Sequence, residues 1–150
     1  MPVFPGDGVD DALVAAAGAR EAVKLMTFHH TLGAHDLLAT LPHVIGPGLA
    51  VTHMGADCVE IGPTGIDKRS GLAWLCERLG VDPADVVAFG DEVNDHEMLA
   101  WAGLGVAMAN ASSWTKSFAD LETASNAEDG VALVIERLLA GEDLRPRPTA

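Results

Sequence analysis

The second half of the chain alternates between helical and strand patterns. A helix is predicted over residues 68–79, where Gly80 follows as a C-terminal glycine and four apolar side chains recur at helical spacing: Leu72, Leu75, Cys76 and Leu79. Further helices are predicted over 94–102, 112–120 and 128–139. The runs 85–89 and 103–108 are nearly all apolar, which is typical of strands buried on both faces of a parallel sheet. This half therefore predicts an α/β fold, with helices flanking a parallel sheet.

The first half is less regular and is closer to an α+β pattern. A helix over 10–19, a strand over 22–28 and a short helix over 35–41 are predicted there. The apolar runs 49–54 and 58–61 have the spacing of a β-hairpin. A turn-rich segment begins at Gly62, so we place three parts at 1–62, 63–140 and a charged, proline-rich and flexible tail at 141–150.

Composition and charge narrow the class of protein. Of the 150 residues, 49% are hydrophobic, which excludes a disordered acidic chain. The formal net charge of −13 argues against nucleic acid and against an anionic membrane surface as partners. No apolar run is long enough to span a membrane, and the first residues do not resemble a signal peptide. Cys58 and Cys76 form no recognisable pair, so we expect free thiols and a cytoplasmic protein.

The residues with the strongest chemical signal follow the predicted strand 85–89. Gly90 begins the segment Gly-Asp-Glu-Val-Asn-Asp, which then opens a helix. Ligands bind at the carboxyl ends of parallel strands. There Asp91 and Asp95 offer the hard oxygen ligands that Mg²⁺ prefers, and Asn94 offers a hydrogen bond to a phosphoryl oxygen. An ordinary capped helix start has a similar composition, so this segment alone leaves both interpretations open.

Lys68 is a second candidate because it stands at the start of a predicted helix. A cation there opposes the helix dipole, and a phosphate bound at the same place would explain it. A solvent-exposed lysine is the simpler alternative for this residue taken by itself.

Together these segments resemble the haloacid dehalogenase (HAD) superfamily, and in particular its Cof-type sugar-phosphatase branch. The resemblance runs from Gly65-Ile66-Asp67-Lys68 through the segment at 90–99 to the stretches 102–111 and 116–132. It covers roughly residues 58–140. It implies the C-terminal half of a Rossmann-like core, preceded at 22–61 by the last section of a mobile α+β cap.

The resemblance also implies a reaction. Members hydrolyse small phosphate monoesters, sugar phosphates among them, with Mg²⁺ and through an aspartyl-phosphate. By position, Lys68 would hold the phosphate and the charge of the nucleophile, and Asp91 would bind Mg²⁺. Asp95 would support the metal directly or through water, Asn94 would contact the phosphate, and Asn110 is a weaker candidate. The partner is then a small phosphorylated metabolite.

One motif of the family has no counterpart. The nucleophile motif Asp-x-Asp-Gly-Thr/Val is absent, and Asp7-Gly8-Val9 resembles it only superficially. We therefore expect a C-terminal portion that lacks the central strand of its sheet and is inactive alone. It would pair with an N-terminal half chain, or form a homo-oligomer, through the open sheet.

The alternative is a non-catalytic remnant that binds Mg²⁺ or oligomerises. An ion-pumping ATPase domain shares a similar Gly-Asp-x-x-Asn-Asp motif, but its flanking sequences differ.

Overall fold

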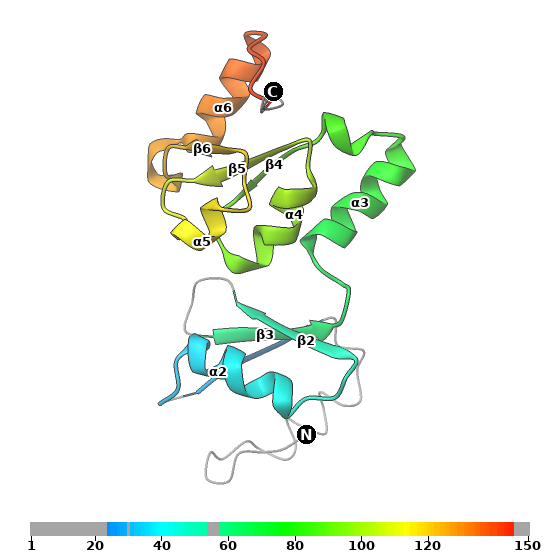
Figure 1. The fold of residues 1–150 in the computed structure, drawn as a ribbon, viewed down its shortest axis with the longest axis vertical. Coiled ribbons are helices and arrows are strands. Elements are labelled where there is room, and N and C mark those ends of the chain that lie inside the picture. The colour runs from blue at the N-terminus through cyan, green and yellow to red at the C-terminus, as the bar shows by residue number, and fades with distance from the viewer. Residues whose placement is uncertain (1–23, 30, 54–57, 146–150) are drawn as a thin grey trace. The chain divides into compact units, whose positions relative to one another are not determined.

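The computed structural model describes residues 24–29, 31–53 and 58–145. It consists of two compact units, 1–65 and 66–150, which are described separately below (Figure 1). The predicted helix over 10–19 and the tail residues 146–150 lie outside the described residues. None of the described helices is long and apolar enough to cross a membrane.

The N-terminal unit is an antiparallel sheet with a helix. Its elements are β1 (Leu25–Phe28), α2 (Ala34–Thr40), β2 (Leu49–His53) and β3 (Cys58–Pro63), with strand order β1-β3-β2. A 3-10 turn, Leu41–His43, follows α2. The middle strand and the helical segment share one core, formed by Leu37, Leu41, Val59 and Ile61. The predicted hairpin is confirmed as the β2–β3 pair, whereas β1 is shorter than the predicted strand over 22–28.

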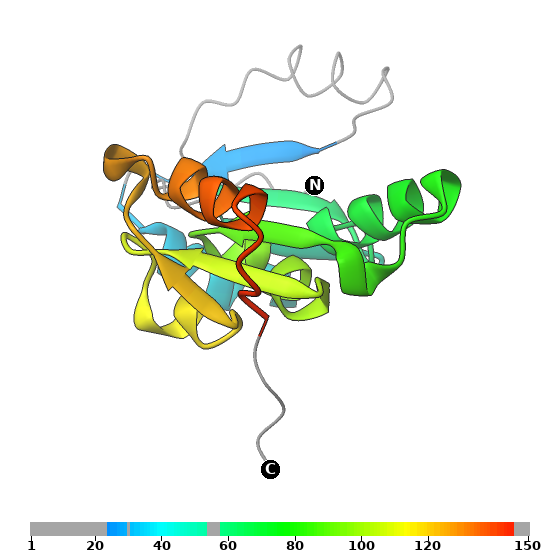
Figure 2. The same cartoon turned by 90° about the horizontal axis from the view of Figure 1, so that it is seen from above.

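The C-terminal unit is a parallel sheet with helices, as predicted. Its elements are α3 (Lys68–Leu79), β4 (Val87–Gly90), α4 (His96–Trp101), β5 (Leu104–Met108), α5 (Ser113–Lys116), β6 (Leu121–Thr123) and α6 (Gly130–Leu139). The strand order is β4-β5-β6, with Val87 opposite Leu104 and Val106 opposite Leu121. Figure 2 shows the three strands side by side, with β5 between the others. Among the described strands, β4 is therefore an edge.

Close backbone packing fixes the middle of this sheet. All five residues of β5 are buried. A Cβ atom added at Gly105 would lie 2.3 Å from the Leu99 carbonyl oxygen, and one at Gly103 would lie 2.2 Å from the Ala84 carbonyl oxygen. Glycine at these positions lets α4 and the turn before β4 pack directly on the sheet backbone. The carboxyl ends of β4 and β5 are thereby held at fixed positions.

One prediction for this unit is wrong. The helix predicted over 112–120 ends at Lys116, and the short strand β6 follows it. Asp120 accounts for the change of direction, since its carboxylate accepts a hydrogen bond from the Gly105 backbone N–H at 2.9 Å.

The expectation of free thiols is confirmed for both cysteines. Cys58 of the N-terminal unit is half-buried, and Cys76 of α3 is buried.

The predicted apolar faces of the two long helices are only partly covered. In α3, Cys76 is buried, but Leu75 and Leu79 are 45% and 67% exposed. In α6, Val134 is 1% exposed whereas Leu139 is 83% exposed. The apolar stripe of each helix is therefore not fully buried by the other described elements.

Candidate active site

The site is built on the carboxyl end of β4. The strand ends at Gly90, and the chain continues through a 3-10 turn, Val93–Asp95, into α4. A Cβ atom at Gly90 would lie 2.5 Å from the Asp95 Cβ atom, so only glycine lets the Asp95 side chain fold back under the strand end. The local structure therefore explains the first and last residues of Gly-Asp-x-x-Asn-Asp, because the glycine leaves room for the side chain of the final aspartate.

Asp95 is the centre of this turn. Its side chain is buried, and its Oδ2 atom accepts hydrogen bonds from the backbone N–H groups of Asp91 and Glu92, each at 3.1 Å. Its Oδ1 atom forms an ion pair with the Lys68 ammonium group. A buried carboxylate needs such partners because desolvation otherwise disfavours its charge. Asp95 thus links the turn that presents Asp91 to the start of α3.

Lys68 is the first residue of α3 and lies within the capping box that Asp67 and Ser70 form. Its ammonium group also donates to the Asn94 side-chain oxygen at 3.0 Å. The Asp95 carboxylate offsets the unfavourable position of this cation at the positive end of a helix. The Lys68 side chain remains 48% exposed, so the same group is accessible to an anionic ligand from solvent.

Asp91 and Asn110 form the other side of the site. The Asn110 side-chain NH₂ group donates to Asp91 Oδ2 at 2.8 Å, and its side-chain oxygen accepts from the Asn126 backbone N–H at 3.0 Å. Asn110 therefore joins the loop after β5 to the turn after β6. The structure brings the predicted residues Lys68, Asp91, Asn94, Asp95 and Asn110 together into one connected network.

The donor set indicates how a metal ion would be held. Within the described ranges, no group of three or more His, Cys, Asp or Glu side chains forms a metal-binding cluster. Both carboxylate oxygens of Asp95 are engaged by N–H and ammonium groups, whereas the Asp91 carboxylate accepts one hydrogen bond among the described residues, from Asn110 at Oδ2. Mg²⁺ commonly binds one or two carboxylates together with water and phosphate oxygens. Asp91 fits such a ligand, and Asp95 fits the role of the group that positions it.

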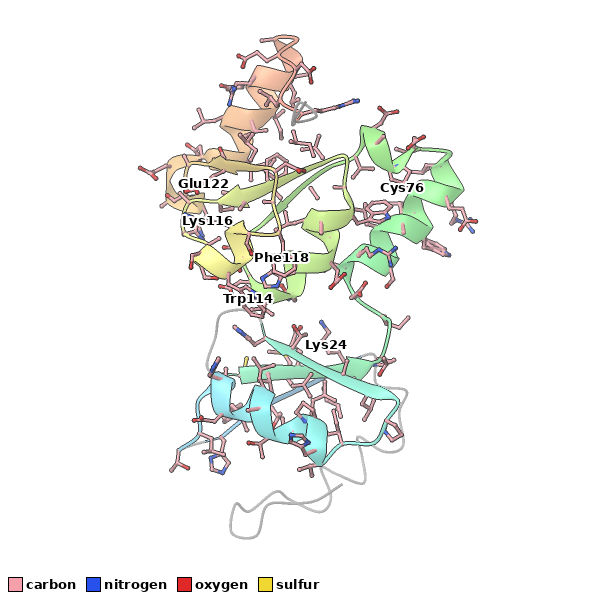
Figure 3. All side chains as sticks on the ribbon, viewed as in Figure 1. Lys24, Cys76, Trp114, Lys116, Phe118 and Glu122 are labelled. Atoms are coloured by element: carbon pink, nitrogen blue, oxygen red, sulfur yellow. The ribbon has the colours of Figure 1, made fainter. Side chains whose placement is uncertain are left out.

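Sequence reasoning missed the packing that supports the turn from the side of α5. The buried His96 ring stacks on Phe118 at 4.1 Å between ring centroids, meets Trp114 edge-on, and lies 3.0 Å from the Thr115 hydroxyl. Figure 3 labels Trp114 and Phe118 in this cluster. In the sequence, the one indication that His96 supports the site is that it directly follows Asp95, the last residue of the Gly-Asp-x-x-Asn-Asp motif. We assign it a packing role.

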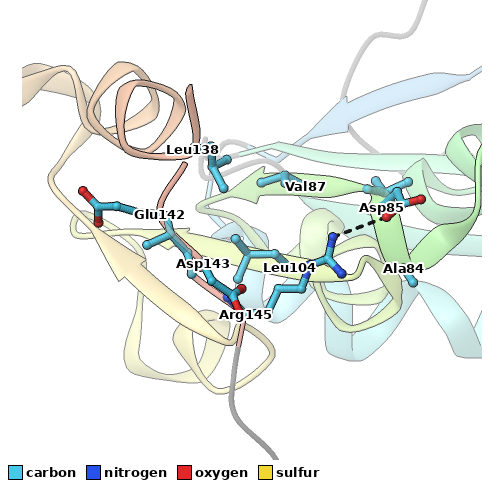
Figure 4. A pocket seen from close by; sticks show the side chains of 10 residues that line it. Ala84, Asp85, Val87, Leu104, Leu138, Glu142, Asp143 and Arg145 are labelled. Atoms are coloured by element: carbon cyan, nitrogen blue, oxygen red, sulfur yellow. Dashed lines mark hydrogen bonds and ion pairs between the residues drawn. The ribbon is translucent and has the colours of Figure 1, made fainter. Parts of the chain in front are cut away.

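A separate cavity lies away from this network. It has a volume of about 330 Å³ and is lined by apolar side chains from the beginnings of β4 and β5 and from α6, including Val87, Leu104 and Leu138. The Arg145 guanidinium lies 3.3 Å from the Asp85 carboxylate at its rim (Figure 4). None of the five predicted site residues lines it.

Comparisons with known proteins identify the family of the chain. The sequence profile of haloacid dehalogenase-like hydrolases matches residues 10–135. The chain is 37% identical over 128 residues to a chloroplastic endoribonuclease of Arabidopsis thaliana, a match that covers 85% of this chain and 21% of that protein. It is 49% identical over 78 residues to a phosphoglycolate phosphatase of Methanopyrus kandleri, which covers 52% of this chain and 34% of that protein.

Solved structures extend the likeness to the fold. A sugar phosphatase of HAD subclass IIB superposes with a TM-score of 0.71 at 25% identity, over 83% of this chain and 46% of that chain. The chain thus spans about a third or less of the two curated relatives and about half of this structural neighbour. Because the family profile matches residues 10–135, which is most of the sequence, this chain belongs to the haloacid dehalogenase-like hydrolase family.

Proposed function

We propose that this chain supplies the acidic, phosphate-binding half of the active site of a Mg²⁺-dependent phosphatase. The substrates would be small phosphate monoesters of the sugar-phosphate kind, hydrolysed in the cytoplasm. The observation that carries the proposal is the network that joins Lys68, Asn94 and Asp95 to Asp91 and Asn110 at the carboxyl end of β4. Membership of a family whose relatives include phosphatases supports it.

Each side chain has a role that its contacts support. Lys68 is half-exposed, so its ammonium group can bind a phosphoryl oxygen while Asp95 keeps it oriented. Asn94 would donate its side-chain NH₂ group to the same phosphate, since its side-chain oxygen already accepts from Lys68. Asp91 would hold Mg²⁺, which when bound supplies positive charge to the phosphoryl oxygens, and Asn110 would fix the orientation of the Asp91 carboxylate.

The covalent step needs a carboxylate nucleophile that these residues do not provide. A carboxylate oxygen attacks phosphorus, the ester P–O bond breaks, and the alcohol leaves with a proton from an acid. Water then cleaves the acyl phosphate, releasing inorganic phosphate and restoring the carboxylate. We propose that an aspartate of a segment outside residues 24–145 fills this role, and that the chain alone does not hydrolyse esters.

Ligand binding by the isolated chain tests the proposal. We expect Mg²⁺ with inorganic phosphate to shift the NMR signals of the Asn94 side-chain amide and the Asp91 backbone amide. Asp91→Asn is expected to weaken Mg²⁺ binding about tenfold or more, because it removes the anionic ligand. Glu97→Gln is the matched control, since it removes one exposed carboxylate of α4 outside the network. Equal Mg²⁺ affinity in wild type and Asp91→Asn would contradict the metal role.

Turnover of p-nitrophenyl phosphate tests the proposal that the chain alone does not hydrolyse esters. We expect no turnover by the purified chain with Mg²⁺. Turnover that Asp91→Ala abolishes would show that the chain contains its own nucleophile. If neither phosphate nor Mg²⁺ binds at this network, the alternative of a non-catalytic remnant is supported instead.

A further inference from the structure

An exposed tryptophan lies beside the candidate active site. Trp114 is on α5, the short helix that follows β5, and 59% of its surface is exposed. Single exposed apolar residues are common on protein surfaces and by themselves indicate nothing. Trp114 differs from such a residue in its position, in its rigid support and in the angles at which its neighbours meet the ring.

Trp114 is close to the residues of the site along two routes. The carboxyl ends of β4 and β5 are adjacent in the sheet. Asn110, which donates to Asp91, comes four residues before Trp114, so the Asn110 and Trp114 Cα atoms are at most about 14 Å apart. The His96 and Trp114 ring centroids are 4.6 Å apart, and His96 directly follows Asp95. The indole is therefore within reach of a ligand whose phosphate is bound by the network.

Side-chain hydrogen bonds hold the backbone around Trp114. The Ser112 hydroxyl caps α5 by accepting from the Thr115 N–H at 3.1 Å. The Ser117 hydroxyl donates to the Trp114 carbonyl at 2.6 Å. Thr115 is 1% exposed, so this helical turn is anchored in the interior. A tryptophan on a fixed backbone offers a large contact area and loses little conformational entropy when a ligand binds, so Trp114 is preorganised as a binding surface.

The aromatic neighbours of Trp114 leave a face of the indole available. His96 and Phe118 meet the Trp114 ring at interplanar angles of 82° and 72°, so neither stacks parallel on it. Trp114 and Phe118 are labelled in Figure 3. Trp74 on α3 is also 59% exposed, but the Arg78 guanidinium lies over its ring, 4.9 Å from the centroid. Of these two equally exposed tryptophans, Trp74 already stacks with a cation of its own helix, whereas Trp114 presents a face to solvent.

We propose that Trp114 determines specificity by stacking on a planar ring in the organic part of the phosphate ester. Lys68 and Asn94 would hold the phosphate while the ring lies on the indole, so that one ligand spans both places. Offset parallel stacking is a favourable arrangement of aromatic rings. Because the face of an aromatic ring is electronegative and the chain has a net charge of −13, an uncharged ring fits better than an anionic one. The substrate class is then a phosphate monoester in which a sugar or another short chain connects the phosphate to a neutral aromatic or heteroaromatic ring.

Two ligands that differ by a ring test this inference on the 150-residue chain. Ribose 5-phosphate and uridine 5′-monophosphate share the phosphate and the sugar, and only the second has a planar ring at the anomeric carbon. Each is titrated in the presence of Mg²⁺, and the indole Nε1–H NMR signals of the three tryptophans report where the ring binds. We expect uridine monophosphate to bind about fivefold more tightly than ribose 5-phosphate and to shift the Trp114 signal but not the Trp74 signal. Ribose 5-phosphate should leave both indole signals in place.

Three variants test the stacking surface itself. Trp114→Ala is expected to remove the preference for uridine monophosphate while the affinity for ribose 5-phosphate stays the same. Trp114→Phe should keep part of the preference, because a smaller ring still stacks and still packs beside His96. Trp74→Ala, which removes a tryptophan of the same exposure from α3, is the matched control and should keep the whole preference. Thermal unfolding of each variant checks that the fold is kept, and Trp114→Phe serves as the test if Trp114→Ala does not fold.

The outcomes separate this inference, which rests on the proposed function, from that function itself. Equal affinity of the wild-type chain for the two ligands overturns the role of Trp114, and so does an equal loss of the preference in Trp114→Ala and Trp74→Ala. If neither inorganic phosphate nor ribose 5-phosphate binds, the proposed function is contradicted. Uridine without phosphate, at millimolar concentration, then decides on the ring: a shift of the Trp114 signal supports the stacking surface, and no shift overturns it.

Discussion

The two units differ in how deeply their edge strands are buried. In the N-terminal sheet the buried residues lie in the middle strand β3, whereas β1 is mostly exposed and β2 is exposed or half-buried. In the C-terminal sheet every residue of the edge strand β4 is buried or half-buried, and every residue of β5 is buried. The edge strands β1 and β4 are both apolar in sequence, so the difference lies in the elements that pack on each sheet and not in strand polarity. The site lies on the unit with the more deeply buried edge strand.

The largest expected effect is the loss of stability when a glycine is replaced by alanine, and it should differ between the two units. Gly105→Ala would place a Cβ atom 2.3 Å from the Leu99 carbonyl oxygen, whereas Gly62→Ala in β3 meets nothing within 4 Å. We expect Gly105→Ala to destabilise the C-terminal unit by roughly 3 kcal/mol, because backbone atoms must move. Gly62→Ala should change stability by less than about 0.5 kcal/mol. Urea unfolding, followed by hydrogen exchange in each unit, measures both changes in stability. Equal losses of stability in the two variants would contradict the difference in packing.

Two lysines of equal exposure, one in each unit, allow a second comparison of the units. Lys24 in the N-terminal unit (labelled in Figure 3) pairs with the buried Glu60 at 2.7 Å, and Lys68 pairs with the buried Asp95; each lysine side chain is 48% exposed. Asp95 keeps two backbone N–H donors when Lys68 is removed, whereas Lys24 is the one side-chain partner of Glu60 among the described residues. The same substitution should therefore have different consequences in the two units.

We expect Lys24→Met to destabilise its unit by about 1–3 kcal/mol, since it leaves a buried carboxylate without that partner, and to leave phosphate binding unchanged. Lys68→Met should destabilise less and abolish phosphate binding at the network. Thermal unfolding and phosphate titration followed by NMR are the measurements. If Lys68→Met binds phosphate as wild type does, its role is structural, like that of Lys24.

Local patterns predicted most of this fold. The helical spacing after Asp67 gave the bounds of α3, and the apolar runs predicted the parallel pair β4 and β5. The site could be predicted from the sequence because four of its residues lie within six positions of one another, so that one turn brings them together: Gly90, Asp91, Asn94 and Asp95. Predicted membership of the HAD superfamily is confirmed by the family match.

The features that were missed depend on contacts between distant segments. Strand β6 has three residues with a central glutamate, so it shows no strand pattern and is defined by its pairing with β5. The bond from the Asn126 N–H to Asn110 joins loops 16 residues apart. Helical periodicity in α3 indicated an apolar face but contained no information on whether another segment covers it, which is why the exposure of Leu79 was not anticipated.

The smallest expected effect concerns the turn that follows β6, where acid should weaken the bond between Ser125 and Glu128. The Ser125 hydroxyl donates to the Glu128 carboxylate at 2.6 Å, and this bond, with a weaker one from the Ser125 backbone N–H, lowers the pKa of Glu128. The stability it contributes is present above the unfolded pKa of about 4.3 and is lost as the pH falls through the folded pKa.

Ser125→Ala is therefore expected to raise the pKa of Glu128 toward its ordinary value and to remove this small acid dependence from the C-terminal unit. Ser117→Ala is the matched control, because the Ser117 hydroxyl donates to the Trp114 carbonyl and not to a carboxylate. An NMR titration of the Glu128 side chain measures the pKa, with amide exchange in β3 of the N-terminal unit as the internal reference. An unchanged pKa in Ser125→Ala would show that the bond from the Ser125 hydroxyl is not what lowers the pKa of Glu128.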